Sequence, residues 1–362
     1  MRFADAAGAS DRLSATLDLV DGSSPDPAGW NVVFYAVGEP QATPGAGCVA
    51  GFVGVLCALG ATAPAALTVD LGAGDDALEL GLKLNAKAAP TQITIAGGPG
   101  NDEIATIRAR ADIDGGEGDD VIGPDERFAN DFPPDPTPGG ALRGGPGTDR
   151  ADYEAALDPI EVSLDDRAND GRPGEGDNVH ADIENVMGSN FGNVLSGSDA
   201  ANVLTGGAAA DRLRGGAGRD TLEGRSGDDT LNALDGAAGD RLDCGDGDDV
   251  ALADAGDTLL GCERLTRAPG IGSARLRFRG GRVALRLSCP KGATCRGTAL
   301  LRSVKTLASG SYRIGSGKRA TIGLRTTSAG RAAFRRAGAA KATLIIQPAG
   351  TRDADGRAVT VR

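Results

Sequence analysis

The chain has 362 residues, a formal net charge of −12 and 57 glycines. Glycine is therefore about twice as frequent as its usual ~7%, whereas aromatic residues make up only 3% of the sequence. A chain so poor in large apolar side chains cannot fill one extensive core, and none of its apolar stretches reaches the ~18 residues of a membrane-spanning helix.

The charge is distributed unevenly along the chain. Residues 266–362 contain 21 Lys+Arg and 2 Asp+Glu, a net +19, whereas residues 1–265 contain 17 and 48, a net −31. An acidic region of this density suits several bound metal cations, and the basic region suits an anionic surface. The sequence therefore predicts two regions with opposite partners.

Residues 1–66 contain short alternating runs such as WNVVFYAV, which begins at Trp30. Alternation of apolar and polar residues is typical of half-buried strands, so we predict an N-terminal β cap on the first coil of the following region. Trp30, Phe34 and Tyr35 are expected to form the core of this cap rather than a platform for a ligand.

Residues 67–265 are predicted to form a β-solenoid, with irregular coils in 67–187, regular nonapeptides in 188–231 and closing turns in 232–265. In the regular part a glycine, an Asn or Asp and a leucine each recur every nine residues. A period this short predicts one strand and one turn per repeat. The leucines expected to point inward are Leu195, Leu204, Leu213, Leu222 and Leu231. The proline-rich stretch 124–140 and the acidic stretch 165–177 are expected to protrude as loops.

Two repeats make one coil, so turns eighteen residues apart should lie one strand spacing apart. Asp211 is then expected to face Asp229, and Asn202 to face Asp220. Bare carboxylates about 5 Å apart repel by roughly 1–3 kcal/mol per pair, and a hard cation with roughly six to eight oxygen ligands would reverse this repulsion. One buried leucine contributes about 1.5–3 kcal/mol, whereas ordering nine backbones costs roughly 9–18 kcal/mol. Folding is therefore expected to depend on several Ca²⁺ ions.

The copies resemble the hemolysin-type calcium-binding nonapeptide repeat of RTX proteins, G-G-x-G-x-D-x-U-x, in which U is a large apolar residue. GGAGRDTLE from Gly215 and GRSGDDTLN from Gly224 follow the pattern best. Copies with alanine or phenylalanine at position four, or asparagine at position six, are expected to bind more weakly or not at all. The predicted calcium-site residues are Gly72, Gly74, Asp76, Gly98, Gly100, Asp102, Gly116, Gly118, Asp120, Asn193, Asn202, Gly207, Asp211, Gly216, Gly218, Asp220, Gly227, Asp229, Asp240, Gly245, Gly247 and Asp249.

Six cysteines fall into three local pairs, for which we predict disulfides and hence an oxidising compartment. The pairs are Cys48 with Cys57, Cys244 with Cys262, and Cys289 with Cys295. Zinc is the competing interpretation, but the sequence has no C-x-x-C pair and only one histidine, His180. Free buried thiols are the other alternative.

An extracellular or cell-surface location is expected, although the first residues lack the apolar segment of a signal peptide. The segment from Arg2 into LTVDLGAGDD resembles the entry region of secreted actinobacterial calcium-repeat proteins. We therefore expect a leader to be missing from the start. The basic C-terminus resembles no type I secretion signal.

Residues 266–362 show the alternation of antiparallel strands, as in RVALRLS from Arg282, and we predict a small basic β-sandwich there. Anionic cell-wall polymer or polysaccharide is the expected partner, with plain structural capping as the alternative. Nucleic acid is disfavoured as a partner of this region, because its only aromatic residues are Phe278, Tyr312 and Phe334 and base stacking needs more of them.

The sequence gives no sign of catalysis. It has no H-E-x-x-H and no G-x-S-x-G motif. His180 is expected to be a loop residue, and acidic pairs such as Asp165 with Asp166 recur within the predicted calcium turns. We predict a structural, adhesive or surface-associated calcium-binding protein that is not an enzyme. A calcium-dependent β-helical polysaccharide lyase, or another extracellular carbohydrate-active protein, is the alternative.

Overall fold

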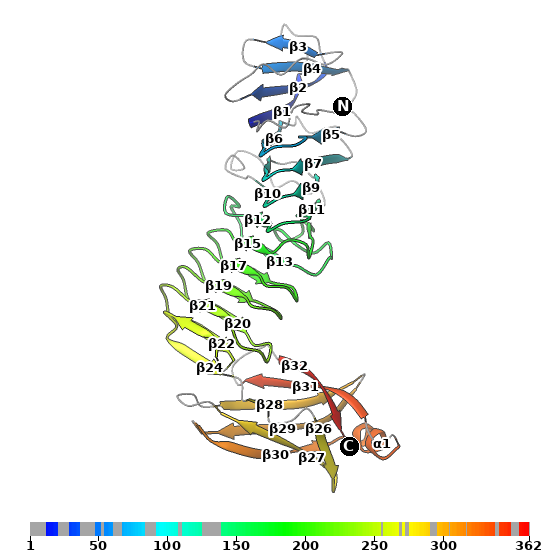
Figure 1. Cartoon of the computed structure of the whole chain (residues 1–362), viewed down its shortest axis with the longest axis vertical. Coiled ribbons are helices and arrows are strands. Elements are labelled where there is room, and N and C mark those ends of the chain that lie inside the picture. Colours follow the sequence, from blue (N-terminus) through cyan, green and yellow to red (C-terminus); the bar gives the residue numbers. More distant parts are fainter. Residues whose placement is uncertain are drawn as a thin grey trace. The chain divides into compact units, whose positions relative to one another are not determined.

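In the computed structural model, the regular secondary structure of the described residues consists almost entirely of β-strands (Figure 1). The described residues are 12–20, 29–36, 48–51, 54–60, 67–83, 92–107, 111–124, 139–254, 256–267, 270–271, 275–289, 295–303, 305–315, 317–336, 340–348 and 355–361. None of the helices in these ranges is long and apolar enough to cross a membrane. The chain divides into two compact units, residues 1–198 with 205–208 and residues 199–204 with 209–362.

The first unit begins with an antiparallel sheet in the order β3-β4-β2-β1. Its strands are β1 (Arg12–Val20), β2 (Gly29–Ala36), β3 (Cys48–Gly51) and β4 (Gly54–Gly60). β1 pairs in parallel with β6 (Ala77–Lys83), the first strand of the coils on that side. The N-terminal strands therefore continue a sheet of the solenoid. The side chains expected to form the core of this cap, at Trp30, Phe34 and Tyr35, lie outside the described residues, as do residues 125–138 of the predicted proline-rich loop.

Parallel coils follow in the first unit. One sheet has the order β15-β12-β10-β8-β6, the second β14-β11-β9-β7-β5, and β13 pairs with β16. The remaining strands are β5 (Leu67–Asp70), β7 (Ile93–Pro99), β8 (Glu103–Ile107), β9 (Asp112–Glu117), β10 (Val121–Pro124), β11 (Ala141–Arg143), β12 (Arg150–Asp152), β13 (Glu161–Ser163), β14 (Asn178–Val179), β15 (Asn185–Met187) and β16 (Val194–Ser196).

The second unit contains the later coils. Their strands pair in the orders β23-β21-β19 and β24-β22-β20-β18. They are β18 (Arg212–Arg214), β19 (Thr221–Glu223), β20 (Thr230–Ala233), β21 (Arg241–Asp243), β22 (Val250–Ala253), β23 (Thr258–Leu260) and β24 (Arg264–Arg267). β17 (Val203–Thr205) contains the sequence boundary between the two units.

The core of the coils consists of inward residues stacked in register, one in most three-residue strands and two or more in several longer strands. Leu78, Ile104 and Ile122 are direct partners in neighbouring strands, and each is at most 2% exposed. The leucines of the regular repeats are buried in the same way, so the prediction that position eight points inward is confirmed. The parallel β-roll architecture predicted for the acidic region is present.

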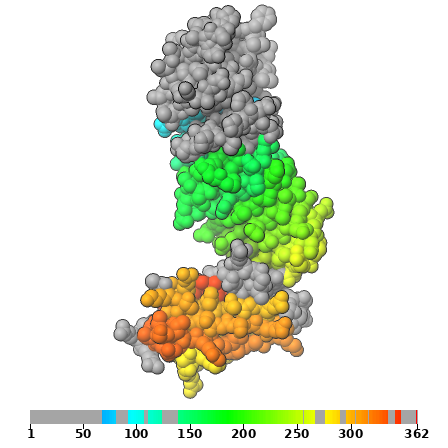
Figure 2. Space-filling model, turned by 180° about the vertical axis from the view of Figure 1, so that it is seen from behind, coloured from blue at the N-terminus to red at the C-terminus, as the bar shows by residue number. Residues whose placement is uncertain are grey.

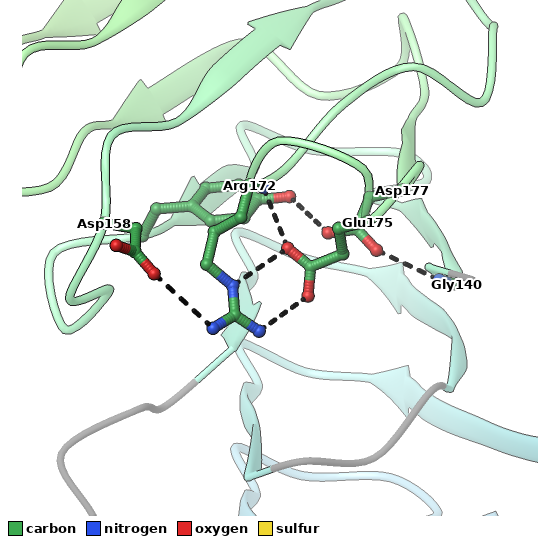
Figure 3. A network of polar contacts seen from close by, with 6 residues as sticks. Gly140, Asp158, Arg172, Glu175 and Asp177 are labelled. Carbon is green, nitrogen blue, oxygen red and sulfur yellow. Dashed lines mark hydrogen bonds and ion pairs between the residues drawn. The ribbon is translucent and has the colours of Figure 1, made fainter. Parts of the chain in front are cut away.

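The acidic stretch 165–177 leaves the coil as a series of turns, and buried carboxylates hold it in place. Asp170 accepts hydrogen bonds from the Ser163 and Val179 N–H groups, at 2.7 and 2.8 Å. Asp177 accepts from the Gly140 N–H at 3.0 Å and from the Tyr153 hydroxyl at 3.2 Å. Close to Asp177, Arg172 pairs with Glu175 and reaches Asp158 (Figure 3).

The basic C-terminal domain is one curled, mainly antiparallel sheet. Its order is β25-β27-β26-β32-β31-β28-β29-β30, and β27 also pairs with β30. The elements are β25 (Gly270–Ile271), β26 (Arg275–Arg279), β27 (Arg282–Ser288), β28 (Cys295–Arg302), β29 (Thr306–Ile314), β30 (Arg319–Thr326), α1 (Ser328–Arg336), β31 (Ala340–Pro348) and β32 (Asp355–Val361).

Inside the curled sheet, alternate residues of each strand build an apolar core. In β27 these are Val283, Leu285 and Leu287, all at most 2% exposed. The Phe278 and Phe334 rings pack 5.2 Å apart, which brings α1 onto this core. The space-filling view shows the described side chains of the domain, coloured from yellow through orange to red, as a closely packed body (Figure 2).

Disulfides join Cys244 to Cys262 and Cys289 to Cys295, as predicted. The first links the end of β21 to the last turn before β24, and the second links the residue that follows β27 to the first residue of β28. The β3–β4 register places the backbones of Cys48 and Cys57 opposite each other, but their side chains lie outside the described residues.

Candidate metal centre

The glycine-rich turns have the left-handed backbone that their sequence predicts. Positive φ occurs at positions two and four of the two copies whose position-six residues are Asp102 and Asp120. The φ angles of Gly98, Gly100, Gly116 and Gly118 lie between 115° and 146°. The other predicted glycines with positive φ are Gly72, Gly74, Gly216, Gly218, Gly227, Gly245 and Gly247. Side chains are strongly disfavoured in this region, so these turns need glycine.

The copies that begin at Gly197 and Gly206 depart from this backbone. Ala200 and Ala209 occupy position four of their copies and do not have positive φ, and neither does Gly207. In the copy that begins at Gly224, by contrast, position two is Arg225, a non-glycine residue that keeps a positive φ of 71°. The substitutions at position four that were expected to alter the turns therefore do coincide with a different backbone.

Position-six aspartates form a ladder along the first unit. The Asp102 carboxylate accepts a hydrogen bond from the Asp76 N–H at 2.8 Å, Asp120 accepts from Asp102 at 2.8 Å, and Asp149 accepts from Asp120 at 2.9 Å. Glu184 ends the ladder by accepting from the Asp149 N–H at 2.8 Å. Each coil is thus joined to the next through a buried carboxylate.

The second unit contains two further ladders of the same kind. Asp229 accepts from the Asp211 N–H at 2.8 Å, as the eighteen-residue spacing predicts, and Asp220 accepts from Asn202 at 2.9 Å. Asp249 and Asp240 continue these two ladders, accepting from Asp229 and Asp220. Glu263 ends one of them by accepting from the Asp249 N–H at 2.9 Å. Neither Glu184 nor Glu263 was predicted.

One oxygen of several ladder carboxylates has no partner. Oδ2 is buried without a hydrogen bond in Asp102, Asp120, Asp149, Asp229 and Asp249. An unpaired buried carboxylate oxygen is costly. Burial is the main reason that the pKa of Asp102, Asp120 and Asp149 is raised to about 6, and that of Asp229 to about 7. Neighbouring carboxylates add to the shift, and the ladder hydrogen bonds oppose it.

Backbone carbonyls approach these unpaired oxygens. A methyl group on Gly97 would lie 2.3 Å from Asp102 Oδ2 and 2.3 Å from the carbonyl oxygen of Gly115 in the next coil. On Gly224, it would lie 2.3 Å from Asp229 Oδ2 and 2.4 Å from the Cys244 carbonyl oxygen. Only glycine leaves this space open. Carboxylate and carbonyl oxygens are the ligands that calcium prefers, so the residues fit that ion.

In the copy that contains Asn193, hydrogen bonds satisfy the side-chain position that is left unpaired in the aspartate copies, and no ion is needed. Asn193 Nδ2 lies where the other copies place Oδ2, at 2.7 Å from a methyl group on Gly188, and it donates to the Ser189 carbonyl at 2.8 Å. The Ser189 hydroxyl donates to Asn193 Oδ1 at 2.9 Å. This turn is therefore satisfied by its own amide, and a weak or empty site there stays a prediction.

A second ladder runs along the outside of the turns, at position five. Asp75 accepts from the Asn101 N–H, Asn101 Oδ1 accepts from Asp119, and Asp119 accepts from Thr148, each at 2.8 Å. Asp228 likewise accepts from Asp248 at 3.0 Å. These bonds run from a later coil to an earlier one, opposite to the inner ladders. Position five is variable in the sequence pattern, which therefore did not predict them.

Residues 187–222 and 205–237 match the family model of the RTX calcium-binding nonapeptide repeat (4 copies). The chain carries RTX repeats. The match covers the regular nonapeptides, whereas the Asp102, Asp120, Asp149 and Asp249 turns of similar geometry lie outside it. A search of curated proteins found no match.

Acidic, histidine and cysteine side chains do not gather in threes anywhere in the described part of the chain. The oxygens that converge beside the RTX turns are one carboxylate oxygen and backbone carbonyls. The His180 ring contacts Asp166 and Asn178: its Nδ1 is 3.1 Å from Asp166 Oδ1, and its Nε2 is 3.1 Å from Asn178 Nδ2. These contacts hold the ring beside the acidic stretch 165–177.

Proposed function

We propose that this chain is a secreted calcium-binding protein whose acidic coils become stable when calcium neutralises the aspartate ladders. The observation that carries the proposal is the set of buried, unpaired Oδ2 atoms beside carbonyl oxygens of neighbouring coils. Glycine carbonyls and Asp102, Asp120, Asp149, Asp229 and Asp249 would hold the ions, which would supply positive charge where the fold lacks it.

Without the ion, adjacent ladder carboxylates repel and remain desolvated, which favours an expanded acidic region. With the ion bound, the repulsion between carboxylates no longer opposes burial of the apolar core of the coils. Extracellular calcium suits such a mechanism, because extracellular calcium-binding modules bind the ion with dissociation constants of about 10⁻⁴–10⁻³ M. The two disulfides support an oxidising compartment.

The biological role that we infer is structural, adhesive or surface-associated, without catalysis. The stack of coils would serve as a calcium-dependent spacer, and the basic domain would attach it to an anionic polymer. Its net charge of +19 over residues 266–362 supports such a partner.

Far-ultraviolet circular dichroism of the full chain during a calcium titration tests the folding mechanism, with magnesium as the control. Magnesium requires a smaller octahedral site and keeps its water more firmly. A cooperative gain of β signal with calcium alone is expected. A folded spectrum that neither calcium nor a chelator changes would refute calcium-coupled folding.

A further inference from the structure

The outer face of the C-terminal sheet carries a row of arginines at directly opposite positions. Arg279 of β26 is the register partner of Arg282 in β27, and Arg282 is the partner of Arg325 in β30. Figure 1 shows these three strands in the domain. All three arginines are exposed, on the face opposite to the buried Val283 and Leu285. We name Arg279, Arg282 and Arg325 the arginine row.

Directly opposed residues on one face of a sheet have Cβ atoms about 4.5–5.5 Å apart, and like charges at such positions are destabilising. Carboxylates do not relieve the repulsion, because among the described residues no ion pair joins Arg279, Arg282 or Arg325 to an acidic side chain. The whole segment 266–362 has only two acidic residues. The arginine row therefore costs stability that an external anion would restore.

Small residues form a flat surface next to the row. Ala284 and Gly323 are exposed partners in the adjacent register position. The Arg282 side chain lies across this surface, since a methyl group on Gly323 would meet its Cδ at 3.4 Å and its Nη1 at 3.6 Å. An extended chain could lie flat here and reach several guanidinium groups, which match anionic oxygens with two parallel hydrogen bonds.

The other groups on this face indicate which polyanion fits. Hydroxyl groups accompany the arginines, because Thr321 is opposite Arg286 and Ser309 is opposite Arg325. Aromatic platforms for bases are missing among the described residues of this domain, since Tyr312 and Phe334 are buried and Phe278 packs against the core. Nucleic-acid binding without sequence preference uses such platforms. A chain of anionic groups and hydroxyls fits the face better.

We propose that the arginine row and the adjacent Ala284–Gly323 surface bind a linear anionic polysaccharide. This inference rests on the proposed surface role and names the residues that would perform it. The sugar acids would pair with Arg279, Arg282 and Arg325, and sugar hydroxyls would bond to Thr321 and Ser309.

The test measures binding of fluorescently labelled hyaluronate oligosaccharides to the full chain by anisotropy, at one fixed calcium concentration. The double variant Arg279→Gln/Arg282→Gln removes an opposed pair from the row. The control Arg296→Gln/Arg313→Gln removes another opposed and exposed pair, on β28 and β29, with the same change of charge. We expect the row variant to bind roughly 5–30-fold more weakly, as for the loss of two exposed ionic contacts, and the control variant to change less than about twofold.

Equal losses in both variants, or no loss in either, would overturn the inference. Tighter binding of single-stranded DNA than of hyaluronate at the same salt concentration would also overturn it. Calcium titration of each variant by circular dichroism separates this inference from calcium-coupled folding. A normal calcium response without hyaluronate binding refutes only the polysaccharide site, whereas a lost response in the unmodified chain refutes the folding mechanism.

Discussion

Asparagine in place of Asp120 is expected to stabilise the calcium-free protein and to destabilise the calcium-bound protein. Asp120 is 1% exposed, its Oδ1 accepts from the Asp102 N–H at 2.8 Å, and its Oδ2 has no partner. Burial raises its pKa from 3.8 to about 6. At about pH 7.5 the folded protein must therefore hold a charge that its surroundings disfavour, at a cost of about 1–3 kcal/mol.

Asp120→Asn keeps the oxygen that accepts the ladder bond and removes the charge. The new amide can donate to a turn carbonyl, as Asn193 donates to Ser189. Without calcium, the free energy of unfolding should rise by about 1–2 kcal/mol. With saturating calcium, the same change removes a charged ligand, and a tenfold loss of affinity at one site lowers the free energy of unfolding by about 1.4 kcal/mol.

Urea denaturation followed by circular dichroism, with calcium and with chelator, measures both effects. The control is Asp112→Asn on β9, because Asp112 lies outside the turns and accepts from the Ala141 N–H at 3.1 Å, a bond that asparagine retains. The control should shift stability equally in both conditions. If Asp120→Asn lowers stability by the same amount with and without calcium, the carboxylate acts only as a hydrogen-bond acceptor and the reasoning fails.

Three further changes test other parts of the structure. Gly118→Ala should lower the free energy of unfolding by more than about 3 kcal/mol in calcium, because φ is 133° and the methyl group would lie 1.9 Å from a carbonyl oxygen of the neighbouring coil. Gly174→Ala is its control: φ is 89° and the methyl group meets nothing within 4 Å, so a loss of only about 1–2 kcal/mol is expected by urea denaturation. Burial is the main reason that the pKa of Asp177 is raised to about 7 in the folded protein, above the unfolded value of 3.8. Its contribution to stability is thus complete below about pH 4 and lost as the pH rises through about 7. Urea midpoints of the calcium-free chain should fall across this range, and Asp177→Asn should flatten the profile; an unchanged profile would contradict the assignment. Replacing both Cys244 and Cys262 with serine opens a loop of 18 residues and should cost about 3 kcal/mol in a thermal melt with calcium, whereas an unchanged melting temperature would show that packing alone holds the last coil.

The regular repeats could be interpreted from the sequence because their period fixes both the face of each side chain and its partner. Leu213 and Leu231 are register partners, and Asp211 contacts Asp229, as a coil of two nonapeptides requires. The alternating runs of the basic region likewise predicted most of its strands. In β29, by contrast, Ser309, Gly310 and Ser311 interrupt the alternation, so the sequence gives no strand signal there.

The irregular coils could not be aligned from spacing alone. Ladder partners in the first unit are separated by 26, 18, 29 and 35 residues, from Asp76 to Glu184. The segments between these turns differ in length, while the hydrogen-bonded register of the turns is maintained. The end residues Glu184 and Glu263 were missed because a glutamate outside the nonapeptide pattern gives no sequence signal. The local pattern thus determines each turn, but tertiary pairing determines which turns meet.

The Asn193 turn can become ordered before any ion binds, and it can therefore nucleate the folding of the neighbouring coils. In a linear array of repeats, starting the first ordered unit is the costly step, and each later unit adds to a neighbour that is already formed. A turn closed by its own amide lowers this initial cost at every calcium concentration. Order should then spread outward from residues 188–193 as calcium rises, and the transition should be more gradual than in an array made only of aspartate turns.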